Sequence, residues 1–217
     1  MPLLPEITVT GADFAYLARV LRLCAGDNFE TIQEHKIGVY KIEKIAKHSL
    51  TAALQKEYAE NNEPEKKLHL VLPLLKADKL AYVLQKAVEV GVHKFWLYEP
   101  DNSPARLNGK ENKLARWQKI IASAVCQSRR NHLPDLAKIK LPELAGKFCA
   151  VFFAHPAAEK YWPDFPDGSA LVIGPESGFS PAELNYLAVN ASGFSLGGRI
   201  LRAETAAVAI PARILLG

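Results

Sequence analysis

Apolar runs of strand length alternate with helical patterns over residues 68–217, and this alternation restricts the fold more than any other feature of the chain. The apolar runs are residues 68–72, 95–98, 148–154, 171–173 and 194–196. Between them, apolar side chains recur at helical spacing from Leu80 to Val90 and from Leu114 to Val125. Continuous apolar strands that alternate with helices form parallel sheets with both faces covered. We therefore predict an α/β domain with a mainly parallel sheet.

Residues 1–66 differ from the rest because short, partly alternating runs dominate them. The predicted strands are residues 7–9, 20–23, 28–33, 37–45 and 49–56, and a short helix is predicted over residues 12–20. Several short strands in so short a segment suggest a compact β-barrel. A polar stretch, residues 59–67, contains Pro64 and separates the two patterns. We expect two domains, residues 1–66 and 67–217.

Two glycine-containing loops join predicted strands to predicted helices near the C-terminus. The first, IGPESGF at residues 173–179, precedes Ser180 and Glu183, which have the spacing of a capping box. The second, LGGRILRAETA at residues 196–206, leads into a helix predicted over residues 203–215. Such loops lie at the carboxyl edge of a parallel sheet, where ligands bind. A plain β–α turn explains the first loop equally well, whereas Arg199 and Arg202 around an apolar pair favour a ligand site in the second. Neither loop matches GxGxxG or a P-loop, so neither a dinucleotide nor a nucleoside triphosphate is favoured.

Positive charge is concentrated in the middle of the chain. Residues 106–147 contain ten basic side chains, namely Arg106, Lys110, Lys113, Arg116, Lys119, Arg129, Arg130, Lys138, Lys140 and Lys147. Only Glu111, Asp135 and Glu143 oppose them. Such an excess can attract a phosphate backbone, but a solvated helix face is the more common explanation of a basic run. Alone, the charge makes nucleic acid only one possible partner.

The remaining features indicate a cytoplasmic protein. No stretch is long and apolar enough for a membrane span, and residues 1–10 lack the basic and apolar regions of a signal peptide. Cys24, Cys126 and Cys149 are far apart and odd in number, which favours free thiols over a disulfide framework or a zinc site.

Several motifs, in order along nearly the whole chain, resemble those of one family. LVIGPESGFSPAEL at residues 171–184 and LGGRILRAETA at residues 196–206 resemble the two C-terminal motifs of the ribosomal RNA small subunit methyltransferase E family. Upstream, the similar segments are RVLRL at 19–23, LPLLKADKL at 72–80, QKAVEVGV at 85–92 and QSRRNHLP at 127–134. The chain departs from the family's usual pattern at Leu3, where an arginine is common, and at Ser177, where glycine is common.

The resemblance implies a PUA-like β-barrel domain that binds RNA, followed by a SPOUT domain with a trefoil knot. It also implies a homodimer, S-adenosylmethionine as methyl donor, no metal, and a 16S ribosomal RNA or small-subunit substrate methylated at uridine N3. Two alternatives stay open: a related SPOUT enzyme that methylates a ribose hydroxyl or another RNA, and an RNA-binding protein without turnover.

The same resemblance assigns site residues. The implied donor pocket consists of Phe153, Ala154, His155, Ile173, Gly174, Pro175, Glu176, Leu196, Gly197, Ile200, Leu201 and Arg202. Arg202 is expected to stabilise the uracil anion that forms when N3 loses its proton. Glu204 and an ordered water are the weaker candidates to accept that proton. Four basic side chains are expected to contact RNA, namely Arg19, Arg22, Arg129 and Arg130.

Overall fold

The computed structural model describes residues 3–33, 36–103, 106, 111–159 and 161–217. The chain divides into two compact units, Met1–Asn62 and Glu63–Gly217. The division lies earlier than the expected boundary between residues 66 and 67, because Glu63 makes its hydrogen bonds within the second unit. The helices of the described segments are all too short or too polar to span a lipid bilayer.

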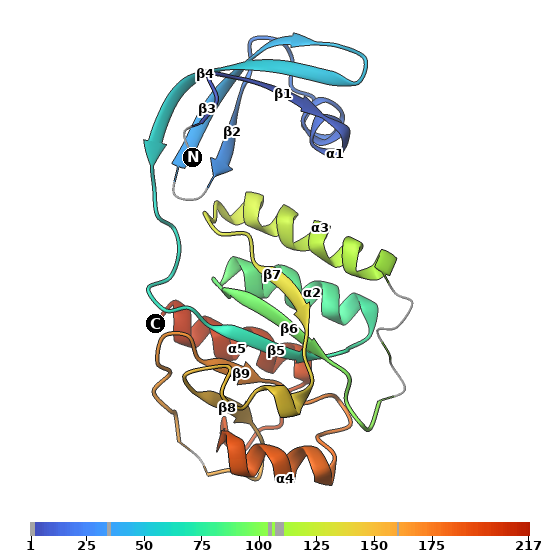
Figure 1. The fold of residues 1–217 in the computed structure, drawn as a ribbon, viewed down its shortest axis with the longest axis vertical. Coiled ribbons are helices and arrows are strands. Elements are labelled where there is room, and N and C mark those ends of the chain that lie inside the picture. Colours follow the sequence, from blue (N-terminus) through green and yellow to red (C-terminus); the bar gives the residue numbers. More distant parts are fainter. Residues whose placement is uncertain (1–2, 34–35, 104–105, 107–110, 160) are drawn as a thin grey trace. The chain divides into compact units, whose positions relative to one another are not determined.

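The first unit is built on one antiparallel sheet (Figure 1). Its strands, in the order β1-β4-β3-β2, are β1 (Glu6–Thr10), β4 (Ser49–Ala59), β3 (Lys36–Ile45) and β2 (Asn28–Gln33). Two irregularities in the β3–β4 pairing, at Val39/Tyr40 and at Ile42/Lys44, curl the sheet around a small core that includes Phe14. In the described residues β1 and β2 are edge strands, so the expected barrel is an open, curled sheet.

A helical segment follows β1, as predicted. It consists of α1 (Gly11–Ala15) and one π-helical turn, Tyr16–Val20. The strand predicted over residues 20–23 is wrong. The Leu21 N–H donates to the Tyr16 carbonyl at 2.9 Å, so the chain is still coiled there, and Arg22 adopts a left-handed conformation with φ of 57°.

The second unit contains the predicted parallel sheet, in which six strands are ordered β10-β8-β9-β5-β6-β7 and every neighbouring pair is parallel. The strands are β5 (His69–Pro73), β6 (Lys94–Tyr98), β7 (Asp135–Lys138), β8 (Val151–Ala154), β9 (Ala170–Val172) and β10 (Ser192–Phe194). Strand β7 was not predicted, because a four-residue segment with charged ends has no apolar run.

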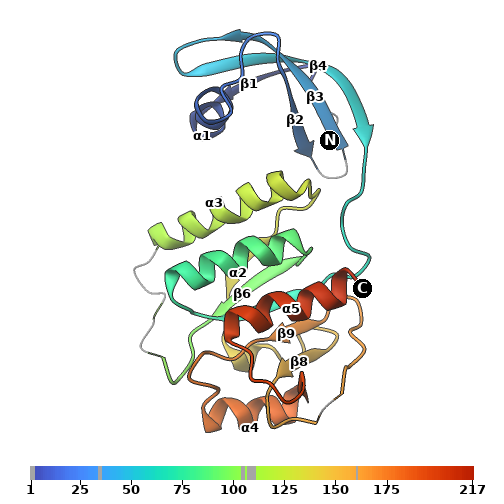
Figure 2. The ribbon, with the colours of Figure 1, turned by 180° about the vertical axis from the view of Figure 1, so that it is seen from behind.

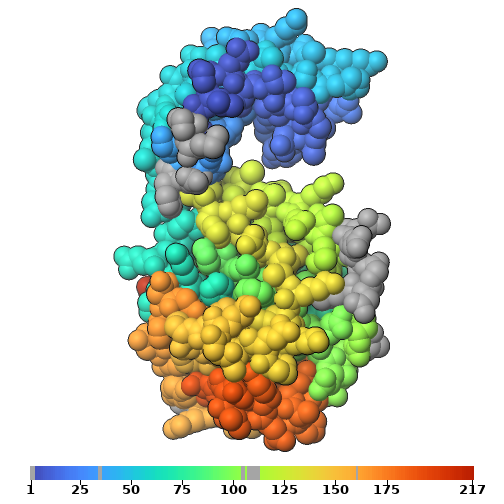
Figure 3. All heavy atoms as spheres, viewed as in Figure 1, coloured from blue at the N-terminus to red at the C-terminus, as the bar shows by residue number. Residues whose placement is uncertain are grey.

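Helices cover both faces of this sheet. Figure 2 shows α2 (Ala77–Glu89), α3 (Glu111–Ser128) and α5 (Ala203–Leu215) side by side on one face. The other face is covered by α4 (Pro181–Asn190) and by the segment after β7, which form much of the surface seen in Figure 3. Leu70 and Leu72 of β5 pack in the first core and Val71 between them packs in the second, as strand alternation requires.

The capping box predicted at the start of α4 is present. The Ser180 hydroxyl accepts a hydrogen bond from the Glu183 N–H at 3.1 Å, and the Ser180 N–H donates to the Glu183 carboxylate at 2.7 Å. These bonds satisfy backbone donors that the helix itself leaves without partners. They fix the end of the glycine loop that precedes α4.

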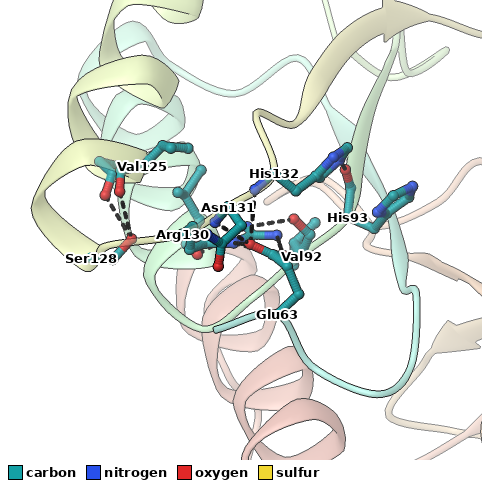
Figure 4. Close-up of polar contacts among 10 residues, drawn as sticks. Glu63, Val92, His93, Val125, Ser128, Arg130, Asn131 and His132 are labelled. Carbon is teal, nitrogen blue, oxygen red and sulfur yellow. Dashed lines mark hydrogen bonds and ion pairs between the residues drawn. The ribbon is translucent and has the colours of Figure 1, made fainter. Parts of the chain in front are cut away.

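Arg130 is a structural residue, which corrects the expectation that it contacts RNA (Figure 4). Its side chain is 3% exposed and forms an ion pair with Glu63. One guanidinium nitrogen also donates to the carbonyls of Val88 and Val92, at 3.1 and 2.8 Å. A guanidinium buried and engaged in this way cannot reach a phosphate.

Glu63 fixes the start of the second unit to the α3–β7 loop. Besides Arg130, its carboxylate accepts hydrogen bonds from the N–H groups of Asn131 and His132, at 2.8 and 3.0 Å. The next residue, Pro64, packs over Gly91, where an added Cβ would lie 2.3 Å from the proline ring. Residues 63–64 are therefore part of the α/β unit, although their polar sequence suggested a linker.

Candidate active site

The two glycine loops of the second unit meet around one cavity of about 570 Å³. Its walls come from the carboxyl ends of β8 and β9, the loops after β9 and β10, and the first turn of α5. The predicted pocket residues that line it are Ala154, His155, Ile173, Gly174, Pro175, Glu176, Leu196, Gly197, Ile200, Leu201 and Arg202. Segments far apart in sequence thus meet where parallel sheets bind ligands.

Phe153 does not line the cavity and stands behind its wall. Its side chain is buried, and its ring packs edge-on against Phe179 with centroids 6.0 Å apart. Phe179 is the residue that faces the cavity at this point. The sequence motif placed Phe153 correctly at the end of β8, but strand alternation turns its side chain into the second core.

Glycines shape the cavity where a side chain would strain or block it. Gly178 and Gly197 have φ angles of 75° and 109°, which other residues rarely adopt. A Cβ on Gly174 would lie 3.0 Å from the Phe179 ring. The absence of a side chain at Gly174 therefore lets the Phe179 ring pack closely against the loop. The loops therefore bring backbone groups close to the cavity.

Part of the cavity wall is apolar and open to solvent. Leu196, Ile200 and Leu201 line it, and the side chain of Ile200 is 82% exposed. Apolar groups gathered at one site lose contact with water when a ligand or a partner covers them. The wall can therefore bind a partly apolar group.

Lys79, a residue that the sequence did not single out, joins two walls of the cavity. It lies in the first turn of α2, and its ammonium is 3.1 Å from Glu176 Oε1 and 3.2 Å from Glu204 Oε1. Hydrogen bonds to Glu176 and then Glu204 raise the pKa of Lys79, so it stays protonated at neutral pH. The sequence does not indicate these ion pairs, because Glu176 and Glu204 lie 97 and 125 positions away from Lys79.

Glu204 is held as an anion, which weakens the expectation that it accepts a proton. A hydrogen bond from its own backbone N–H lowers its pKa; burial acts in the opposite direction, and Lys79 and Arg202 lower the pKa further. A carboxylate with a lowered pKa is a poor base at neutral pH. Its contacts assign Glu204 to holding Lys79.

Two arginines bring positive charge to the same cavity. Arg202 is exposed at the N-cap position of α5, and Arg199, the other arginine of the second glycine loop, also lines the cavity. A guanidinium donates several hydrogen bonds in a fixed plane, which suits a carbonyl or an anion of a ligand. The site therefore combines an apolar wall with cationic donors.

Arg130 is buried, but the three other predicted RNA contacts are exposed. Arg19 and Arg22 lie on the surface of the first unit, and Arg129 lies on the surface of the second. Of the basic stretch, Lys110 lies outside the described residues. Three more of its side chains are exposed on α3, namely Lys113, Arg116 and Lys119.

A second cavity, of about 680 Å³, lies between the ends of β6 and β7 and helix α4. Asp101 and Glu183 line it, and both belong to the hydrogen-bond network that caps α4. Neither glycine loop contributes to it. It is larger than the first cavity but lacks that cavity's glycine-shaped walls and paired arginines.

Comparison with known proteins places these features in one family. A family model described as an RNA methyltransferase domain matches residues 61–215. The ribosomal RNA small subunit methyltransferase E of Mesomycoplasma hyopneumoniae is 35% identical over 190 residues, which cover 81% of this chain and 82% of that protein. The protein of the same name from Synechocystis is 32% identical and covers 96% of this chain and 72% of its own length.

Two solved structures match nearly the whole length of the chain. A ribosomal RNA small subunit methyltransferase E from Neisseria gonorrhoeae, bound to S-adenosyl methionine, has a TM-score of 0.86 and 25% identity. That match covers 99% of this chain and 93% of the other. A Legionella pneumophila protein in complex with the cofactor SAM has a TM-score of 0.91 and 27% identity, with 96% and 90% covered.

Proposed function

Because this chain belongs to the RNA methyltransferase family that includes ribosomal RNA small subunit methyltransferase E, we propose that it transfers a methyl group from S-adenosylmethionine to N3 of a uridine in 16S ribosomal RNA. The observation that carries this proposal is the meeting of both glycine loops and the β8 end around one cavity. Relatives with the same fold were crystallised with this donor. The cytoplasm, where ribosomal RNA is made in bacteria, is the compartment that we propose.

The cavity fits the donor in size and chemistry. Its volume of about 570 Å³ lies within the range of roughly 300–1,000 Å³ that is typical of small-molecule sites. Leu196, Ile200 and Leu201 would contact the flat adenine ring, and the glycine loops would offer backbone hydrogen bonds. The donor, when bound, supplies an electrophilic methyl group.

Arg202 is the residue that we assign to the chemistry. Uracil N3 carries a proton at neutral pH, so the nucleophile forms only when that proton is lost. A guanidinium that donates to a uracil oxygen stabilises the anion and favours that loss. Arg202 suits this role because it is exposed at the edge of the cavity and its charge is permanent. Because Glu204 is paired to Lys79, we propose that the N3 proton passes through an ordered water to a base in the bulk solvent.

We propose that the enzyme works as a homodimer and that its C-terminal loops form the trefoil knot implied by the family motifs. The 82% exposed Ile200 beside the cavity supports a partner at this surface. We further propose that the curled sheet of the first unit is PUA-like and contacts RNA through Arg19 and Arg22, which are exposed. Arg129 would contact RNA from the second unit.

A methyl-transfer assay tests the proposed activity. Purified protein is incubated with isotopically labelled S-adenosylmethionine and small-subunit RNA that lacks modifications, and large-subunit RNA serves as the control substrate. We expect label in the small-subunit RNA only. Label at a ribose hydroxyl would support the related SPOUT activity, and donor binding without transfer would support an RNA-binding protein.

A further inference from the structure

The ion-pair bridge centred on Lys79 lies inside the cavity wall. Lys79 comes from α2, Glu176 from the loop after β9, and Glu204 from the first turn of α5. Lys79 and Glu176 line the cavity themselves, and Glu204 is next to the lining residue Ala203. One ammonium group thus connects the segments on two sides of the cavity.

Without that ammonium, the two carboxylates would repel each other. Both lie within 3.2 Å of the same nitrogen, so they are also near one another. Glu204 is 15% exposed, Lys79 28% and Glu176 41%, so water reaches the bridge but screens the repulsion only in part. Two adjacent carboxylates favour either protonation of one of them or separation.

We propose that Lys79 is a positioning residue for the methyl donor, because it holds the Glu176 loop against the start of α5 and so keeps both walls of the cavity at binding distance. This inference rests on the proposed use of S-adenosylmethionine. Lys79 acts through the two carboxylates rather than through a bond to the donor. The pKa of Lys79 is raised and that of Glu204 is lowered, so this pair is charged at neutral pH.

The test compares donor affinity in charge variants by isothermal titration with S-adenosylmethionine. Lys79→Met should raise the dissociation constant about tenfold, because repulsion between the carboxylates opens the cavity. Adding Glu204→Gln to Lys79→Met removes the repulsion and should restore affinity to within about threefold of wild type. Lys79→Arg, which keeps the charge, should bind almost normally.

Lys86→Met is the matched control on the same helix. Lys86 pairs with Glu89 one turn away at 2.9 Å, so its loss removes an equal charge without affecting a contact between segments. We expect its donor affinity to change by less than about twofold. Thermal unfolding without donor shows whether each variant is folded.

The pH dependence gives a second readout. In Lys79→Met the unpaired carboxylates should have raised pKa values, so a fall from about pH 7.5 to about pH 5.5 should protonate one of them and recover donor affinity. The wild-type protein should show no such recovery, because the Lys79 ammonium lies between the two carboxylates and offsets their repulsion.

Each outcome decides between the proposals. If wild type does not bind S-adenosylmethionine, the proposed function fails. If wild type binds but Lys79→Met binds equally well, or if the double variant binds as weakly as Lys79→Met, the bridging role fails and Lys79 either has no role or contacts the donor directly. If Lys79→Met does not fold, the double variant should fold, and its failure to do so would also overturn the bridging role.

Discussion

At the scale of single residues, a substitution of Arg202 should slow methyl transfer and leave donor binding nearly unchanged. Arg202→Ala should lower the single-turnover rate by on the order of a hundredfold, equivalent to about 3 kcal/mol, because a developing anion loses one charge-assisted donor. Donor affinity should stay within a few-fold, since apolar contacts and backbone groups dominate it. Arg199→Ala, which removes the other arginine of the cavity, shows whether losing any positive charge here has the same effect. An Arg202 variant that turns over nearly as fast as wild type would contradict the assigned role.

Glu63 should make stability depend on pH. Burial raises the pKa of Glu63. The hydrogen bonds and charge of Arg130, together with hydrogen bonds from the N–H groups of His132 and Asn131, lower it by more, so the pKa lies below its ordinary value of 4.5. The ionised form is thus favoured by folding, and its stabilisation is complete above pH 4.5 and lost as pH falls through the lowered pKa. Urea titrations measure the unfolding free energy of wild type and of Glu63→Gln, and the difference between the two should shrink as the pH falls below 4.5. A difference that does not vary with pH would refute this.

Arg130 connects several elements of the second unit, so its loss should lower the unfolding free energy. It connects the end of α2, through Val88 and Val92, to Glu63. Arg130→Ala should cost about 3–5 kcal/mol of unfolding free energy, because it removes the ion-pair partner of the Glu63 carboxylate and one hydrogen-bond donor to each of the Val88 and Val92 carbonyls. Arg116→Ala, an exposed position on α3, should cost less than about 0.5 kcal/mol. Chemical denaturation measures both, and equal losses would contradict the structural role.

Elements with a strong periodic pattern were predictable, and those defined by distant contacts were not. The capping box at Ser180 and the start of α5 at Ala203 follow from neighbouring residues, so the sequence locates them. The short strand β7 is stabilised by pairing with β6, and its own residues do not indicate it.

The candidate site shows the same limit. Family motifs located the glycine loops, but the bridge at Lys79 depends on contacts across the fold. Arg130 belongs to a basic motif, and only its burial beside Glu63 distinguishes it from the exposed Arg129. Local charge therefore predicted the segment but not the role of each side chain.

The whole molecule is predicted to be a dimer in solution. Light scattering at micromolar concentration should give about twice the chain mass of 23.9 kDa. Ile200→Glu should weaken the association, because it would bury a charge at the exposed apolar wall beside the cavity. Val189→Glu, at an 84% exposed position on α4, is the control. A monomer that methylates RNA at the wild-type rate would contradict the dimer proposal.

The most direct test is nucleoside mass spectrometry of small-subunit RNA from cells that lack this protein. We predict that one N3-methyluridine disappears from 16S RNA, returns when the wild-type chain is expressed, and does not return with Arg202→Ala. An unchanged N3-methyluridine level in the deletion strain, or loss of a ribose-methylated nucleoside in its place, would contradict the proposed activity.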